Sequence, residues 1–123
     1  MLTPRQQSGK RAEDLAAEFL RAHGCEILVR NYRRRLGELD LIAREGGVLV
    51  IAEVRTRAHA AFGSAAASVD WRKQRRITRA AQQLLQQHAE LACLPVRFDV
   101  LVVHGLAGGA PRVEWIRHAF EAR

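Results

Sequence analysis

The stretch that most constrains the fold is residues 36–57, where two apolar runs flank the Glu-Gly-Gly sequence of residues 45–47. A glycine-rich turn between two β-forming runs predicts a β-hairpin. Residues 48–51 are four consecutive apolar residues, which is typical of a strand covered on both faces. Charged side chains on such a covered hairpin therefore call for a physical explanation.

Two acidic residues, Asp40 and Glu53, lie on opposite arms of this hairpin. A two-residue turn at Gly46-Gly47 pairs Asp40 with Glu53 on one face of the sheet, with Cβ atoms about 5 Å apart. A turn at residues 45–46 shifts the register by two and keeps them on that face. A three-residue loop without a bulge would put them on opposite faces.

Two neighbouring carboxylates repel each other, and their burial is costly unless a positive charge lies between them. Mg²⁺ suits such a pair, because it binds one or two carboxylates together with waters and substrate phosphate. We therefore expect Asp40 and Glu53 to bind Mg²⁺ or Mn²⁺. The alternative is a solvated sheet face on which Glu and Arg side chains pair across strands.

Two sequence strings of the hairpin resemble known families. Asp40 with Glu53-Val54-Arg55 resembles the Asp…Glu-x-Lys motif of restriction-endonuclease-like nucleases. The longer strings at residues 37–42 and 53–57 resemble a narrower group, the YraN-like family of small uncharacterised bacterial proteins, which is similar to archaeal Holliday-junction resolvases. The similarity extends from Gly9 to Phe120, and Gly-Glu-x-Asp-Leu-Ile is its most specific part.

This resemblance implies one restriction-endonuclease-like α/β domain over residues 1–123, with a central mixed sheet flanked by helices. The element order α-β-β-β-α-β-β can also be read from the apolar periodicities alone. The resemblance further implies a metal-dependent nuclease that acts on DNA, with branched or structured DNA as the substrate by analogy with resolvases. The same analogy allows a homodimer.

Individual site residues follow from the resemblance. Asp40, Glu53 and the carbonyl of Val54 match metal ligands, and Glu13 matches a glutamate of the first helix that contributes to the metal site. Glu13 lies at the edge of the apolar stripe of its helix, and a surface carboxylate is the alternative.

Arg55 departs from the motif, because the nucleases usually have lysine at this position. A guanidinium neutralises charge on a phosphate but stays protonated and cannot act as a general base. The departure keeps open a second interpretation, a nucleic-acid-binding module of the same fold with little or no cleavage. If cleavage requires a lysine there, Arg55→Lys should raise it.

The charge balance indicates the class of partner. The chain has 20 Lys and Arg residues against 13 Asp and Glu residues, a net charge of +7. Such an excess predicts a polyanionic partner, nucleic acid or an anionic membrane surface, although a protein-binding protein with an incidentally basic surface is a third interpretation. No N-terminal apolar stretch is long enough for a signal peptide or a membrane span, and Cys25 and Cys93 form no pair motif. These features favour a cytoplasmic protein that binds nucleic acid rather than a membrane.

The predicted nucleic-acid contacts are clustered in sequence. One cluster is a basic turn before the hairpin, and another is the start of the second long helix, where positive charge opposes the helix dipole unless a polyanion binds. The predicted residues are Arg33, Arg34, Arg35, Arg57, Arg72, Lys73, Gln74, Arg75 and Arg76.

The remaining elements are predicted from periodicity and turn residues. A capping box at Thr3-Pro4, or a start near Ser8, opens the first helix, and Gly24 ends it. Asp70 or Ser68 caps the second helix, whose apolar stripe runs to His88 and which ends near Leu91. The other predicted segments are strands at 26–33, 95–104 and 112–116, a loop at 56–68 anchored by Phe62-Gly63, and a helical turn through Phe120.

Overall fold

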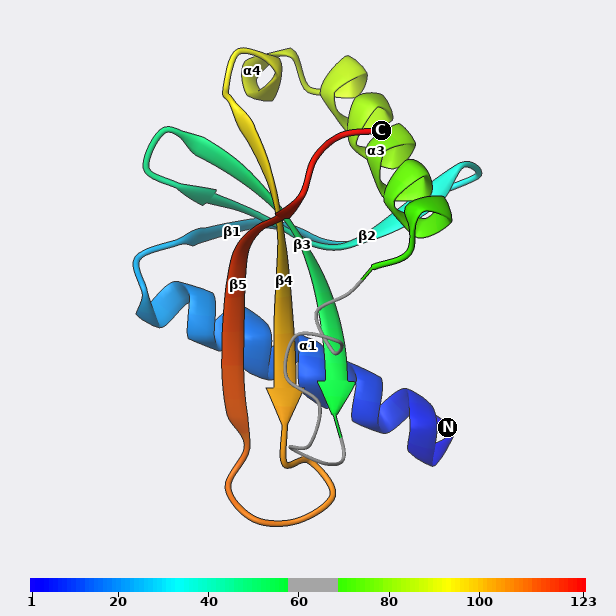
Figure 1. Cartoon of the computed structure of the whole chain (residues 1–123), viewed down its shortest axis with the longest axis vertical. Helices are drawn as coiled ribbons and strands as arrows, with labels where there is room; N and C mark the ends of the chain where they lie inside the picture. Colours follow the sequence, from blue (N-terminus) through cyan, green and yellow to red (C-terminus); the bar gives the residue numbers. More distant parts are fainter. Residues whose placement is uncertain (58–68) are drawn as a thin grey trace.

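The computed structural model describes residues 1–57 and 69–123. The predicted order of one helix, three strands, a helix and two strands is confirmed (Figure 1). The predicted anchor at Phe62-Gly63 lies outside the described residues. The elements are α1 (Pro4–Ala22), β1 (Glu26–Arg34), β2 (Gly37–Glu45), β3 (Val48–Arg57), α3 (Trp71–Gln87), α4 (Ala89–Ala92), β4 (Val96–His104) and β5 (Arg112–Phe120).

The strands form one mixed sheet in the order β1-β2-β3-β4-β5. Neighbouring strands are antiparallel except β3 and β4, which are parallel and are joined through α3. β3 lies at the centre, and residues 49–53 are buried. This burial explains its nearly continuous apolar sequence.

Helices cover both faces of the sheet and create two apolar cores. Small residues of α1, including Ala12 and Ala16, let that helix approach one face closely, against Leu41 and Val50. On the other face, the Ile77 side of α3 packs against residues such as Ile42, Ile51 and Val100. In Figure 1, α1 crosses behind the sheet and α3 lies beside β2. The two carboxylates of the hairpin must therefore lie against one of these two covering layers.

The helix starts follow the predicted chemistry. Thr3 and Gln6 form the reciprocal capping box, with N···O distances of 2.9 and 3.1 Å, and α1 ends before Gly24, which has φ +89°. Asp70 caps α3 by accepting the N–H of Lys73 at 2.9 Å. This cap satisfies a backbone N–H of the first turn of α3.

Several predicted boundaries were wrong. β3 continues through Thr56 and Arg57, which were predicted to begin the loop. β1 continues one residue beyond its predicted end, through Arg34 of the predicted basic turn, because Arg34 pairs with Gly37 of β2. The second helix ends at Gln87, since His88 has φ −129° and ψ 81°, and its imidazole lies at the cap rather than in the core stripe. The chain then forms the separate turn of α4, which buries Leu91 before β4 begins.

The last of these errors concerns the C-terminal end, where β5 continues to Phe120 in place of a helical turn. A bulge interrupts the regular alternation of β5, with His118 at φ +53°, and the ladder resumes at the Phe98–Phe120 pair. The rings of that pair stack at 5.1 Å between centroids. Because the bulge breaks the alternation of inward and outward side chains, the period-two pattern did not predict the last residues of this strand.

Candidate metal and nucleic-acid site

The hairpin of β2 and β3 has the register that a two-residue Gly46-Gly47 turn predicts. Its pairs run from Glu45–Val48 to Leu41–Ala52, so the next position along each strand brings Asp40 beside Glu53. Both line one narrow cleft with Ile77 of α3. The carboxylates therefore share the α3 face of the sheet.

Asp40 is held in place by the backbone of the opposite strand. Its Oδ2 accepts the N–H of Val54 at 2.9 Å, where the strand ladder gives way to this side-chain contact. Burial, followed by the negative charge of Glu53, raises the pKa of Asp40 to about 7, although the Val54 N–H lowers it in part. The folded environment thus disfavours the charged form of Asp40.

Glu53 has a direct cationic partner in Lys73, which lies in the first turn of α3. The Nζ of Lys73 lies 2.7 Å from Oε1 of Glu53, whose side chain is 7% exposed, whereas that of Lys73 is 34% exposed. The ammonium group therefore reaches from the protein surface to a buried carboxylate. It also contributes to lowering the pKa of Asp40, but less than burial and Glu53 raise it.

Val54 and Glu13 border the pair in different ways. In a strand, the N–H and C=O of one residue point toward the same neighbour, so the Val54 carbonyl faces the Asp40 side as its N–H does. Glu13 lies on α1, where burial raises its pKa and a hydrogen bond from Asn31 opposes the rise. Its charge reaches Asp40 and raises the pKa of that residue. Within residues 1–57 and 69–123, no three His, Cys, Asp or Glu residues form a group that could hold a metal.

Arg55 lies two residues beyond Glu53 on β3 and thus on the same face. Its Nε is buried and has no hydrogen-bond partner among the residues that the structure describes. The pKa of Asp70 at the start of α3 lies below its usual value, mainly because Asp70 accepts the Lys73 N–H. The positive charge of Arg55 also lowers this pKa, so the guanidinium lies near the start of α3. A buried unpaired donor is costly, and an anion bound beside Arg55 would satisfy it.

A groove beside the carboxylates gathers several of the predicted basic residues. It has a volume of about 380 Å³ and lies between the turn that joins β1 to β2 and one face of α3. We call it the basic groove, and its cationic lining residues are Arg33, Arg34, Arg35, Lys73 and Arg76. Lys73 is common to the groove and to the carboxylate pair, so the two features are continuous.

Comparison with known proteins identifies the family. Residues 12–103 match the Uncharacterised protein family UPF0102. The chain belongs to UPF0102. It is similar to the UPF0102 protein of Xanthomonas euvesicatoria pv. vesicatoria (strain 85-10), with 47% identity over 122 residues, 99% of this chain and 98% of that one. It is also similar to the UPF0102 protein of Pseudomonas savastanoi pv. phaseolicola (strain 1448A / Race 6), with 42% identity over 118 residues and 96% of each chain.

Four predicted nucleic-acid residues of this UPF0102 chain do not line the basic groove. Arg72 lies over the Trp71 ring at 5.8 Å, and Arg75 is exposed elsewhere on α3. Arg57 is the last residue of β3, where its backbone lies beside that of His104 on β4. The Gln74 amide donates to the Val69 carbonyl and accepts from Arg123, so the chain itself uses this side chain.

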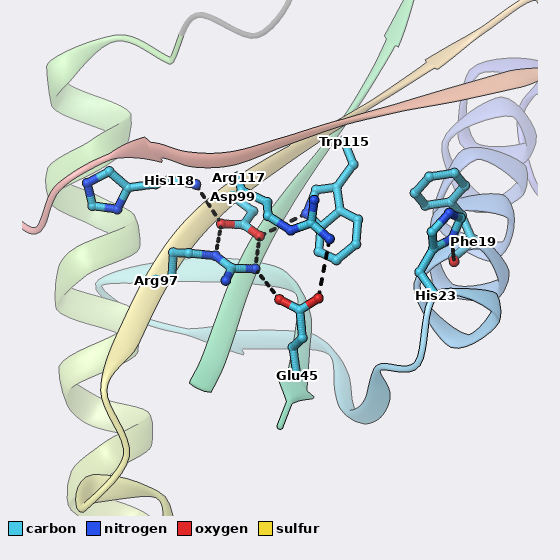
Figure 2. Close-up of polar contacts among 8 residues, drawn as sticks. All are labelled: Phe19, His23, Glu45, Arg97, Asp99, Trp115, Arg117 and His118. Carbon is cyan, nitrogen blue, oxygen red and sulfur yellow. Dashed lines mark hydrogen bonds and ion pairs between the residues drawn. The ribbon is translucent and has the colours of Figure 1, made fainter. Parts of the chain in front are cut away.

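A second polar cluster of this UPF0102 chain was not predicted, and Figure 2 shows it around Asp99. Asp99 is 0% exposed and accepts from Arg97, Trp115 and the backbone N–H of His118 at 2.8 to 2.9 Å. Glu45 joins Arg97 to Arg117, which stacks on Trp115 at 3.6 Å. These contacts hold β5, with its bulge, against β4 and against the end of β2 at Glu45. Arg97 and Asp99 are two residues apart on β4 and therefore share one face of the strand. This spacing is the feature of the sequence that indicates the cluster.

No helix in the described parts of the chain is long and apolar enough to cross a membrane.

Proposed function

We propose that this UPF0102 protein is a Mg²⁺-dependent nuclease that hydrolyses phosphodiester bonds of DNA. The observation that carries the proposal is the carboxylate pair. Asp40 and Glu53 lie on one covered sheet face, and burial with mutual repulsion raises the pKa of Asp40 to about 7. Such repulsion is typical of a functional site that a bound cation relieves.

The donor set suits Mg²⁺. Asp40, Glu53 and the Val54 carbonyl offer three oxygen ligands from two adjacent strands, and Mg²⁺ commonly takes one or two carboxylates with water and substrate phosphate. Glu13 would contribute through an intervening water, because its carboxylate already accepts a hydrogen bond from Asn31. When bound, Mg²⁺ polarises the scissile phosphate and lowers the pKa of an attacking water.

The basic residues of the chain would position the substrate. The unpaired Nε of Arg55 is a donor for a phosphate oxygen beside the carboxylates, and its fixed charge would offset negative charge on the transition state. The basic groove would hold the flanking DNA backbone, since guanidinium groups bind phosphate oxygens bidentately. The similarity of the YraN-like strings to Holliday-junction resolvases favours branched DNA as the substrate.

A nucleic-acid-binding module with little or no cleavage is the second candidate. The specific observation in its favour is Arg55, which occupies the usual lysine position of the motif. This candidate predicts DNA binding without hydrolysis.

The test is a cleavage panel of linear, flapped, four-way and single-stranded DNA with Mg²⁺ or Mn²⁺. We expect cleavage that is fastest on a branched substrate and that Asp40→Asn abolishes, while the variant still binds DNA. Binding without cleavage on all four substrates would favour the second candidate. Cleavage that survives Asp40→Asn would point to a contaminating nuclease or to another site.

A further inference from the structure

We propose that Lys73 of α3 provides the ammonium group that the Glu-x-Lys motif places on β3, and that Lys73 competes with the metal for Glu53. This inference rests on the proposed nuclease function. It assigns Lys73 two roles at one site: it holds Glu53 before the metal binds and stabilises the reacting phosphate afterwards.

The first basis is the contact itself. The Nζ of Lys73 is 2.7 Å from Oε1 of a carboxylate that is only 7% exposed, whereas the side chain of Lys73 is about one-third exposed at 34%. An ammonium at this oxygen occupies a position that a cation bound to Glu53 would need. A metal that binds Glu53 through Oε1 would therefore displace the ammonium, and the half-buried, flexible lysine stem allows it to turn toward the basic groove that it also lines.

The second basis is the choice of residue. Lys10 and Lys73 are the only lysines among the 20 Lys and Arg residues of the chain. A guanidinium would serve as well for general attraction to DNA, and this chain uses arginine almost everywhere for its positive charge. A compact ammonium instead suits a narrow site shared with a metal and a phosphate, because it is a point charge with three rotatable donors.

The third basis is the division between Lys73 and Arg55. Arg55 lies on the Glu53 face of β3, but its Nε has no hydrogen-bond partner within residues 1–57 and 69–123, whereas Lys73 contacts Glu53 directly. The two residues approach the carboxylates from different elements, the sheet and the helix. Arg55 can thus hold a phosphate oxygen as a broad fork while Lys73 lies nearer the metal ligand.

The proposed step needs no proton from either residue. The oxygen of water forms a new bond to phosphorus, and the bond from phosphorus to the leaving oxygen breaks. One proton of the water passes to solvent, and the leaving oxygen takes one from solvent. Lys73 stays protonated throughout and offsets the charge that builds on the phosphate oxygens.

Lys73→Gln should therefore change two measurements in opposite directions. Mn²⁺ should bind more tightly, by roughly tenfold in Kd, because the competing ammonium is gone. Single-turnover cleavage at saturating DNA and Mn²⁺ should slow by roughly a hundredfold, as for the loss of one transition-state donor. Gln retains a donor for Glu53, and thermal unfolding checks that the variant is folded.

Lys10→Gln is the matched control, since it removes the other lysine, which pairs with Asp14 on the exposed side of α1. Arg55→Lys in the Lys73→Gln background is the rescue, because it returns an ammonium to the motif position. We expect Lys10→Gln to leave both measurements unchanged and the double variant to regain roughly tenfold in rate. In the wild-type background, Arg55→Lys should then raise the cleavage rate less than the Glu-x-Lys motif alone predicts, because Lys73 already supplies the ammonium group.

The outcomes separate this inference from the proposed function. If the wild type neither binds Mn²⁺ nor cuts DNA, the nuclease proposal fails and the role of Lys73 with it. If the wild type does both and Lys73→Gln matches it in rate and in Mn²⁺ affinity, only the Lys73 inference fails. A variant that cuts at the wild-type rate once DNA is saturating would show Lys73 to be a phosphate-binding residue alone.

Discussion

Asp40→Asn is expected to stabilise the metal-free protein at pH 8 while it removes the metal site. The folded state raises the pKa of Asp40 from 3.8 to about 7. Because its pKa is raised in the folded state, protonated Asp40 contributes to the stability of the fold. This contribution is fully present below pH 3.8 and is lost as the pH rises through about 7. Over that window the loss amounts to as much as about 4 kcal/mol, from about 1.36 kcal/mol for each pKa unit. Asparagine stays neutral and can still accept the Val54 N–H, so it avoids this loss.

The measurement is urea unfolding of the wild type and Asp40→Asn between pH 4 and pH 8, with the metal chelated. The two should be similar in stability near pH 4 and diverge as the pH rises, with the variant more stable. Asp14→Asn is the control of opposite sign, because a hydrogen bond from Arg30 lowers the pKa of Asp14 and that variant should lose stability at pH 8. Equal or lower stability of Asp40→Asn at pH 8 would contradict a repulsive carboxylate pair.

Removing three cations from the basic groove should weaken DNA binding strongly and change its salt dependence. Arg33, Arg35 and Arg76 line the groove and face solvent. Each phosphate contact contributes about −0.9 to the slope of log affinity against log salt on duplex DNA. The triple Gln variant should therefore flatten that slope by up to roughly 2.7 units. Two other groove residues are not replaced, because Lys73 contacts Glu53 and Arg34 lies over the Tyr32 ring.

A second triple variant tests position against total charge. Arg11, Arg21 and Arg112 are exposed and do not line the groove, so replacing them with Gln removes the same charge elsewhere. We expect this variant to bind DNA with a slope close to that of the wild type. Equal flattening by both variants would mean that DNA binds by net charge alone.

The hairpin could be predicted from the sequence because its information is local. A two-residue glycine turn fixes the register of the strands that it joins, and strand alternation then puts Asp40 beside Glu53. The same reasoning failed at β5, where the bulge at His118 breaks the alternation. Its Asp99 anchor comes from another strand and is not visible in the β5 sequence.

The basic residues of α3 could have been sorted further by helix periodicity. Lys73, Arg76 and Ile77 recur at helical spacing and face the hairpin, whereas Arg72 and Arg75 point to another side. The contact between Lys73 and Glu53 could not be predicted in this way. It depends on how the crossover between β3 and β4 sets α3 on the sheet, which no local pattern specifies.

The most direct measurement of the central claim is calorimetric titration of Mn²⁺ into the wild type, Asp40→Asn and Glu53→Gln at pH 8. This pH lies above the raised pKa of Asp40, about 7, so the wild type should bind Mn²⁺ and each variant should lose that binding. Asp14→Asn should bind as the wild type does, because Asp14 pairs with Arg30 and Lys10 away from the carboxylate pair. A wild type that binds no Mn²⁺, or variants that bind it as tightly as the wild type, would contradict a metal site at Asp40 and Glu53.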